Sequence, residues 1–431
     1  MKLYKEMNEL ELGREYAALR KEYAACQARG LKLDMSRGKP GYDQLELSMP
    51  MLDMVASDRD MKTLDGSDVR NYGQLEGLPE TRRLFADLLE VAPDQILVGG
   101  NSSLNMMFDA INLAESLGIM GSTPWARLEK VRFLCPVPGY DRHFSICELF
   151  GIEMIPIPMD AEGPDMDLVR RYVEKDSSVK GIWCVPKYSN PTGLTYSDRV
   201  VRAFAALKPA APDFRIFWDN AYCVHDLTDT PDPLLNLFEE CARLGSEDLV
   251  YMFASTSKIS FSGAGIAVMA ASPANMADLK AKRTIQTIGP NKINQLMHAR
   301  FFHDKEAVLR HMARHRELLA PKFEAVLSAL DREIAPLGIA SYTRPRGGYF
   351  ISFDAMEGCA RRIGELCRDA GVVLTSVGAT FPYGHDPSDQ NIRLAPTFPP
   401  VKELEEAMEV FCLSVKLAAI EKLSGQLESA S

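Results

Sequence analysis

The middle of this chain contains a series of short, continuous apolar segments, each separated from the next by a helix-like stretch. Most of these segments are apolar at every position rather than at alternate positions. Unbroken apolar runs are typical of strands in a parallel sheet that helices cover on both faces. We therefore expect an α/β fold built on a mostly parallel sheet of seven strands. The predicted strands are Gln95–Gly99, Val131–Cys135, Ile152–Ile157, Gly181–Val185, Phe214–Trp218, Leu249–Phe253 and Gly265–Ala270.

The two ends of the chain have a different pattern from the middle. Residues from about Asn8 to Ala28 predict a helix with charged residues mixed among Leu, Tyr and Ala. From about Phe301 a long helical stretch precedes several short strands and two further helices. We expect the two ends to form one smaller α+β domain, from residues 1–55 and 300–431. Residues 56–299 would form the large domain.

The composition excludes several classes of protein and site. The 431 residues carry a formal net charge of −10, whereas a protein that binds nucleic acid needs a basic face for the phosphates. The nine cysteines are scattered and none are spaced like zinc ligands, so we expect reduced thiols and no metal site. The sequence begins without an apolar signal core, and no run approaches the length of a membrane span. We expect a cytoplasmic protein whose partners are small molecules rather than nucleic acid or membrane.

A lysine in a loop of small residues is the first candidate for chemistry. Lys258 follows the predicted strand Leu249–Phe253 and is surrounded by Ser, Thr and Gly. If burial lowers its pKa, such a lysine can act as an amine nucleophile toward an aldehyde. Polar residues follow other predicted strands too, and the carboxyl ends of parallel strands form one ligand-binding edge. The residues at this edge are Ser102, Ser103, Tyr140, His143, Asn190, Asp219 and Lys258.

Three motifs in a fixed order carry a family resemblance. They are Asn190-Pro-Thr-Gly193, Asp219-Asn-Ala-Tyr222 and Ser255-Thr-Ser-Lys258. The ordered set resembles the fold-type I enzymes that use pyridoxal 5′-phosphate. It is most similar to the class I/II aminotransferases, in an aspartate aminotransferase-like subgroup that looks like the catalytic domain of MocR-type regulators. The resemblance extends over most of the chain and implies a homodimer with active sites at the interface.

The resemblance implies distinct roles around the cofactor ring. Lys258 would form a Schiff base with the aldehyde and later move the proton between the substrate Cα and the cofactor. Asp219 would pair with the protonated pyridine nitrogen, which keeps the ring able to accept electrons. Asn190 and Tyr222 would hydrogen-bond to the phenolic oxygen.

The resemblance also implies how the phosphate and the substrate are held. Ser102 and Ser103 open a helix, where free amides and hydroxyls favour an anion. Arg393 matches the arginine that grips the substrate α-carboxylate, for which a guanidinium fork is suited. The other candidates are Ser255 and Ser257 for the phosphate, Tyr72 for the phosphate of the partner subunit, Tyr140 for stacking on the ring, and Gly38 and Asn190 for the substrate. We interpret His143 and His225 as structural.

The sequence departs from the pattern of the resembled enzymes at two points. Most of them carry an arginine for the phosphate eight residues after the lysine, where this chain has Ile266. The usual arginine of the partner subunit for a side-chain carboxylate is also missing. Its possible replacements are Arg37, Lys39, Gln286, Lys292 and Arg346.

Transfer of an α-amino group from an L-amino acid to a 2-oxo acid is the favoured function, with aspartate or glutamate as the preferred donor. A β-lyase, decarboxylase or racemase would use the same core residues and remains an alternative. A regulatory protein that senses pyridoxal phosphate is a second alternative, although such proteins carry a basic helix-turn-helix domain before this region. A nucleotide-binding α/β protein is a third, but the chain has no Gly-x-Gly-x-x-Gly or Walker motif.

Overall fold

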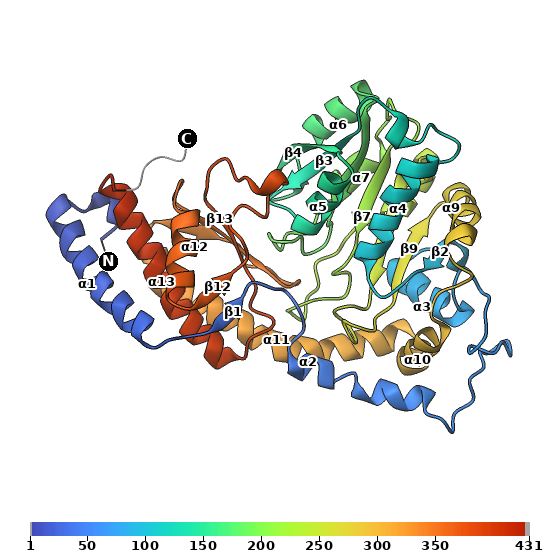
Figure 1. The fold of residues 1–431 in the computed structure, drawn as a ribbon, viewed down its shortest axis with the longest axis horizontal. Helices are drawn as coiled ribbons and strands as arrows, with labels where there is room; N and C mark the ends of the chain where they lie inside the picture. Colours follow the sequence, from blue (N-terminus) through green and yellow to red (C-terminus); the bar gives the residue numbers. More distant parts are fainter. Residues whose placement is uncertain (1, 427–431) are drawn as a thin grey trace.

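A large, mostly parallel sheet forms the centre of the structure. The computed structural model describes residues 2–426, and Figure 1 shows the sheet beside a smaller part that contains both termini. All neighbouring strands from β8 through β7, β6 and β3 to β4 are parallel, whereas β9 is antiparallel to both β2 and β8. The strands, in spatial order, are β2 (Ile96–Val98), β9 (Ala267–Ala271), β8 (Val250–Ser255), β7 (Arg215–Asp219), β6 (Val179–Cys184), β3 (Arg132–Val137), β4 (Glu153–Asp160) and β5 (Gly163–Pro164).

Helices cover both faces of this sheet, and each face has its own apolar core. In β7, Ile216 and Trp218 belong to one core and Phe217 to the other, because successive side chains of a strand point to opposite faces. The helices of this part are α3 (Pro79–Leu89), α4 (Ser103–Leu117), α5 (Asp141–Leu149), α6 (Met166–Lys175), α7 (Asp198–Ala205), α8 (Leu237–Leu244), α9 (Pro273–Gln286) and α10 (Lys292–Phe302). The predicted α/β class with a doubly covered, mostly parallel sheet is confirmed.

The smaller part joins the two ends of the chain around another core. Tyr4 and Leu12 from the N-terminal segment pack in the same core as Phe353 and Phe411. A three-stranded antiparallel sheet and a parallel strand pair lie in this part. Its elements are α1 (Glu9–Ala28), β1 (Leu33–Met35), α2 (Tyr42–Glu46), β10 (Ala340–Tyr342), β11 (Ile351–Ala355), α12 (Ala360–Asp369), β12 (Val372–Leu374), β13 (Asn391–Leu394) and α13 (Val401–Leu423).

One long helix contributes to the cores of both parts. In α11 (Lys305–Glu333), Val308 packs with the large sheet and Val326 with the smaller part. Figure 1 shows this helix running beneath both. The domain boundaries near residues 55 and 300 stay a prediction.

The structure differs from the sequence-based expectations mainly in element boundaries. The sheet has an eighth strand, the two-residue β5, which pairs antiparallel with the end of β4. Its residues, Gly163 and Pro164, have no apolar strand pattern that could reveal it. The first helix begins at Glu9, because the Asn8 side chain accepts a hydrogen bond from the Glu11 amide at 2.9 Å and caps the helix. None of the helices within residues 2–426 has the length and apolar character needed to cross a membrane.

Candidate active site

A cavity of ≈ 560 Å³ opens at the carboxyl ends of the parallel strands. The large part lines it with residues that follow β3, β6, β7 and β8 and with the first turn of α4. The smaller part adds residues from the loop after β1 and from β13. Eleven of the twelve residues predicted for the site line this one cavity: Gly38, Ser102, Ser103, Tyr140, Asn190, Asp219, Tyr222, Ser255, Ser257, Lys258 and Arg393.

Lys258 lies three residues beyond the end of β8, with its ammonium group inside the cavity. Its Nζ is 5.0 Å from the centre of the Tyr222 ring and 5.8 Å from that of Tyr349. The Tyr349 hydroxyl donates to the Lys258 carbonyl oxygen at 3.3 Å and helps to hold the loop. Burial lowers the pKa of the Lys258 amine, and the nearby charge of Asp219 opposes that shift. A lysine with a lowered pKa supplies the neutral amine that nucleophilic chemistry requires.

Asp219 is the last residue of β7 and is almost completely buried. Its Oδ2 lies 3.1 Å from Nε2 of His143. Its Oδ1 is also buried but has no hydrogen-bond partner among the described residues. An unpartnered buried carboxylate oxygen is costly, so this atom is well suited to accept a hydrogen bond from a cationic N–H in the cavity.

His143 was interpreted as structural from the sequence, but it contacts the central carboxylate of the site. It belongs to α5, and its ring stacks on Trp183 with 4.5 Å between the ring centres. The only local signal was its position three residues after Tyr140, just beyond a predicted strand. His225, the other histidine interpreted as structural, is buried between Tyr222 and Tyr349, and burial holds its pKa well below the ordinary value.

Arg393, on β13, has a guanidinium group that is only partly hydrogen-bonded within residues 2–426. Its Nη1 donates to Oδ1 of Asp141 at 2.8 Å and to Oδ1 of Asn190 at 3.2 Å. The guanidinium lies over the Phe350 ring, 4.8 Å from its centre. Its Nε is buried and has no partner among residues 2–426. The side of the guanidinium that carries Nε can therefore bind a carboxylate, while Asn190 keeps its amide hydrogens for another acceptor. Asp141 is a further site residue that the sequence did not suggest.

Two tyrosines complete the walls around the lysine. Tyr222 is buried, and this burial raises the pKa of its hydroxyl well above the ordinary value. Burial also raises the pKa of Tyr140 to about 12. The Tyr140 ring meets His143 edge to face, with 4.9 Å between the ring centres. Both phenols are therefore neutral at physiological pH and can donate a hydrogen bond.

The first turn of α4 and the end of β8 form a group of neutral donors. The Ser102 hydroxyl caps α4 by accepting from the Leu104 amide at 3.2 Å. The Ser255 hydroxyl donates to that of Ser257 at 3.1 Å, and Ser257 donates to the Asn101 carbonyl at 2.9 Å. These hydroxyls and the free amides of a helix N-terminus suit a phosphate.

Ile266, eight residues after Lys258, has an environment that does not suit a phosphate-binding side chain. Ile266 is buried in the apolar core below the sheet edge. Its backbone amide donates to the Thr256 hydroxyl at 2.8 Å. No basic side chain within residues 2–426 therefore comes from this position toward the donors at the start of α4.

Tyr72 is the one predicted site residue that does not line the cavity. Its side chain is 82 % exposed and lies on a loop at the surface. Buried Lys292 supports this loop by donating from Nζ to the carbonyl oxygens of Asn71 and Gly73. Gly289 lies against Gly73, so the segment before α10 packs beside the same loop. The Tyr72 side chain therefore lies outside the chain's own cavity.

Comparisons with known proteins identify the family of this chain. Residues 7–427 match the family described as aspartate amino-transferase. An aspartate aminotransferase from Corynebacterium glutamicum is 46 % identical over 411 residues, which cover 95 % of each chain. The crystal structure of an aspartate transaminase from C. glutamicum superposes with a TM-score of 0.94 at 44 % identity, covering 97 % of this chain and 99 % of that one. The α-aminoadipate aminotransferase LysN from Thermus thermophilus shares the fold, with a TM-score of 0.72 at 20 % identity over 93 % and 95 % of the two chains.

The match extends over nearly the whole length of this chain and of its relatives, so the common activity extends to this protein. It is an enzyme that transfers the amino group of an amino acid to a 2-oxo acid. The chain belongs to the aspartate aminotransferase family.

Proposed function

We propose that this aminotransferase holds pyridoxal 5′-phosphate in the cavity beside Lys258 and uses aspartate or glutamate as amino donor. The observation that carries the proposal is the arrangement of Lys258, Asp219 and Arg393 around one cavity. Asp219 and Arg393 each have a buried polar atom without a partner among the described residues. A cationic ring nitrogen and a carboxylate are the two groups that these atoms would satisfy.

The residues present fit this cofactor at each of its functional groups. Asp219 Oδ1 would accept from the pyridine N–H, and the first turn of α4 with Ser255 and Ser257 would hold the phosphate. Tyr222 and the amide of Asn190 would donate to the phenolic oxygen. The Lys258 amine, whose pKa burial lowers, would meet the aldehyde carbon. The phosphate would be bound by neutral donors, because Ile266 replaces the usual arginine.

When bound, pyridoxal phosphate supplies an aldehyde that takes up the amino group and a ring that withdraws electrons from the substrate Cα. The residues of the chain bind the substrate, move its proton and limit the access of water. Arg393 binds the α-carboxylate and so orients the Cα–H bond toward Lys258. The Lys258 amine accepts and returns the proton of Cα. Tyr140 covers the ring, and the segment at Gly38 limits the access of water to the substrate.

The preference for aspartate or glutamate is supported by the relatives. The proteins from C. glutamicum that are 44 % and 46 % identical over nearly the whole chain are named for aspartate. The basic side chains along the cavity also favour a substrate with two carboxylates.

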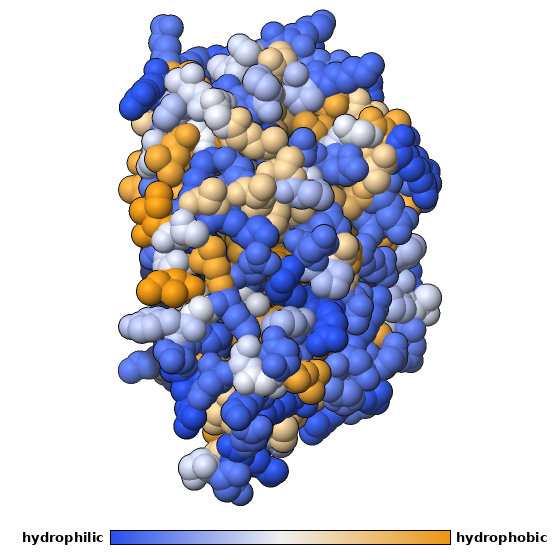
Figure 2. All heavy atoms as spheres, turned by 90° about the vertical axis from the view of Figure 1, so that its right-hand side faces the viewer, coloured by the Kyte–Doolittle hydropathy of each residue, from blue (hydrophilic) through white to orange (hydrophobic). Residues whose placement is uncertain are grey.

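We also propose a homodimer in which Tyr72 reaches the phosphate of the partner subunit. The segment before α3, which contains Tyr72, lies at the right-hand side of the molecule in Figure 1, and Figure 2 shows that apolar side chains lie among polar ones on this side. Leu64, Ile285 and Ile288 are strongly exposed, and the segment that contains Ile288 packs beside the Tyr72 loop. Exposed apolar side chains of this kind favour burial against another subunit. A cytoplasmic location is also proposed, and the nine free cysteines support a reducing compartment.

Absorbance spectroscopy of the purified protein tests the proposal. Aspartate or glutamate alone should convert the aldehyde band of the cofactor to the amine band, and a 2-oxo acid should restore it. Borohydride reduction before digestion should attach the cofactor to the peptide that contains Lys258. The variant Lys305→Ala, at a partly exposed lysine paired with Glu90, should behave like the unchanged protein, and Lys258→Ala should lose the attachment. A colourless protein with no modified Lys258 peptide would refute the proposal.

A further inference from the structure

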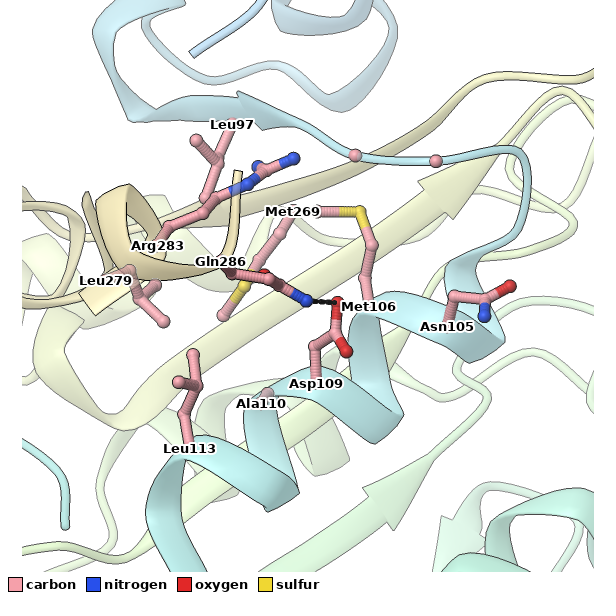
Figure 3. A pocket seen from close by; sticks show the side chains of 12 residues that line it. Leu97, Asn105, Met106, Asp109, Ala110, Leu113, Met269, Leu279, Arg283 and Gln286 are labelled. Atoms are coloured by element: carbon pink, nitrogen blue, oxygen red, sulfur yellow. Dashed lines mark hydrogen bonds between the residues drawn. The ribbon is translucent and has the colours of Figure 1, made fainter. Parts of the chain in front are cut away.

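A residue that binds the side-chain carboxylate of the substrate should be a polar residue that has no other partner within residues 2–426. Three of the five sequence candidates are engaged elsewhere. Lys292 is buried under the Tyr72 loop, where its Nζ donates to two backbone carbonyls. Gln286 donates to Oδ2 of Asp109 at 3.0 Å, in a separate small pocket between α4 and α9 (Figure 3). Arg346 pairs with Asp232 at 3.2 Å, and neither residue lines the active-site cavity.

A fourth candidate lines the cavity but has a partner for its charge. The Lys39 ammonium lies over the Phe398 ring, 3.9 Å from its centre. A cation in that position is stabilised by the ring and loses this contact if it moves to a substrate.

Two arginines at the cavity remain without an acidic partner. Arg37 follows β1 and Arg142 is the second residue of α5. Both are exposed and line the cavity, and neither forms an ion pair within residues 2–426. The charge of Arg142 is felt at the Tyr140 hydroxyl, where it opposes the rise in pKa that burial causes. Both arginines therefore line the same cavity as Lys258.

The basic residues of the cavity lining outnumber its acidic residues. The two acidic groups of the lining are engaged, Asp219 with His143 and Asp141 with Arg393. The basic residues of the lining are Arg37, Lys39, Arg142, Lys258 and Arg393. With the cofactor phosphate at the start of α4 and one substrate carboxylate at Arg393, Arg37 and Arg142 would still have no acidic side-chain partner within residues 2–426.

The residue next to each of these arginines contacts either Arg393 or the ring on which Arg393 lies. A Cβ atom on Gly38, next to Arg37, would lie 2.2 Å from the Phe350 ring, and the Arg393 guanidinium lies over the same ring, 4.8 Å from its centre. Only glycine permits this close approach. On the other side, Asp141, next to Arg142, bonds directly to Arg393 at 2.8 Å. The backbones of Arg37 and Arg142 therefore lie near Arg393, the predicted α-carboxylate site.

We propose that Arg37 and Arg142 together bind the side-chain carboxylate of a dicarboxylic amino acid, so that one chain supplies both carboxylate sites. This proposal rests on the proposed function, because it names the groups that would select aspartate and glutamate. The pair replaces an arginine of the partner subunit, and a guanidinium group suits a carboxylate because its N–H donors form a planar fork.

The test uses the holoenzyme and the variants Arg37→Met and Arg142→Met. Methionine keeps an unbranched apolar chain and removes only the charge and the donors. The half-reaction with aspartate should show a Kd raised about 10- to 100-fold in each variant, as expected for loss of a charged hydrogen bond. The half-reaction with alanine should stay within about twofold. Arg346→Met is the matched control and should change neither.

A binding measurement gives a readout that does not depend on turnover. Isothermal titration calorimetry with succinate, which has two carboxylates and no amino group, should show binding to the unchanged enzyme. The affinity should fall about 10- to 100-fold in each variant. Circular dichroism and cofactor content check that the variants are folded and loaded.

Several outcomes would overturn the two-arginine site. One is an equal loss with aspartate and alanine, and another is an effect confined to one of the two arginines. Unchanged succinate binding in both variants is a third. If the unchanged enzyme reacts with no amino acid, the proposed function itself fails, and that result is distinct from a failure of the variants to discriminate.

Discussion

His143 Nε2 lies 3.1 Å from Asp219 Oδ2, and both side chains are almost completely buried. The bond fixes one carboxylate oxygen of a residue that lines the cavity, and the other oxygen, Oδ1, has no partner among residues 2–426. The Trp183 ring, stacked on the imidazole, restricts the histidine further. Asp219 is therefore held in one orientation before any ligand binds, which is a form of preorganisation.

Loss of this hydrogen bond should slow the chemistry more than it weakens binding. In His143→Phe the ring shape is kept but Asp219 loses its partner, so the half-reaction rate should fall about 10- to 100-fold, the value of roughly 1.5–3 kcal/mol for a bond to a charged group. The Kd for the amino acid should change little, because His143 does not line the cavity. Stopped-flow absorbance separates the two constants. His303→Ala is the control at a largely exposed histidine, and an equal change in Kd and rate would argue against the positioning role.

Replacement of Arg393 should weaken every amino acid substrate alike. Arg393→Lys keeps the charge but loses the fork and the unpartnered Nε, so the Kd for aspartate and for alanine should each rise about 10- to 100-fold. The half-reaction under saturating substrate measures this. Arg361→Lys, at an exposed arginine of the smaller part, should have no effect. A loss restricted to aspartate would instead assign Arg393 to the side-chain carboxylate.

A mixed dimer can test whether Tyr72 acts across the subunit interface. Tyr72→Ala should lower the affinity for the cofactor, by about 5- to 10-fold for one neutral hydrogen bond. A hybrid of one Tyr72→Ala chain and one Lys258→Ala chain would contain one site with both native residues and one with neither. If Tyr72 serves the partner, half of the sites should therefore bind the cofactor with native affinity and react with aspartate.

The opposite outcome would assign Tyr72 to the cofactor site of its own chain. If Tyr72 served its own chain, both hybrid sites would carry one defect each, and no site would recover native affinity. Titration of the separated hybrid with pyridoxal phosphate, followed at the cofactor band, distinguishes the two.

A buried histidine behind the lysine loop should make the fold sensitive to acid. His298 contacts the hydroxyl of Ser260 at 2.7 Å and the carbonyl of Asn294 at 2.8 Å, and burial lowers its pKa from 6.5 to about 4. Between these two pH values the unfolded chain binds a proton that the folded chain does not, so the free energy of unfolding should fall as pH falls. The slope from this residue is about 1.4 kcal/mol per pH unit.

Urea unfolding at a series of pH values checks this contribution. In His298→Gln the slope between pH 4 and 6.5 should be smaller than in the unchanged protein by that amount. His315, whose pKa burial lowers to about 3, remains in both proteins and supplies part of the remaining slope. An unaltered slope in the variant would show that His298 does not titrate as its burial requires.

Much of the fold was predictable because strand and helix patterns are local. The unbroken apolar runs identified the central strands, and the helix predicted from about Asn8 to Ala28 matches α1 to within a residue. The two-residue β5 was missed because it depends on pairing with the end of β4 rather than on its own residues. The sequence also did not show that α11 contributes to two cores, because its apolar positions do not indicate which elements they contact.

The sequence by itself determined that Lys258, Asp219 and Asn190 would meet, because parallel strands bring their carboxyl ends to one edge. Only the tertiary structure decided which partners these residues have. His143 against Asp219 and Asp141 against Arg393 are contacts between segments far apart in the chain. The same holds for the choice among basic residues, where Lys292 and Arg346 are engaged and Arg37 and Arg142 form no ion pair within residues 2–426. The type of a residue limits its chemistry, but its availability depends on burial and on the groups that folding places beside it.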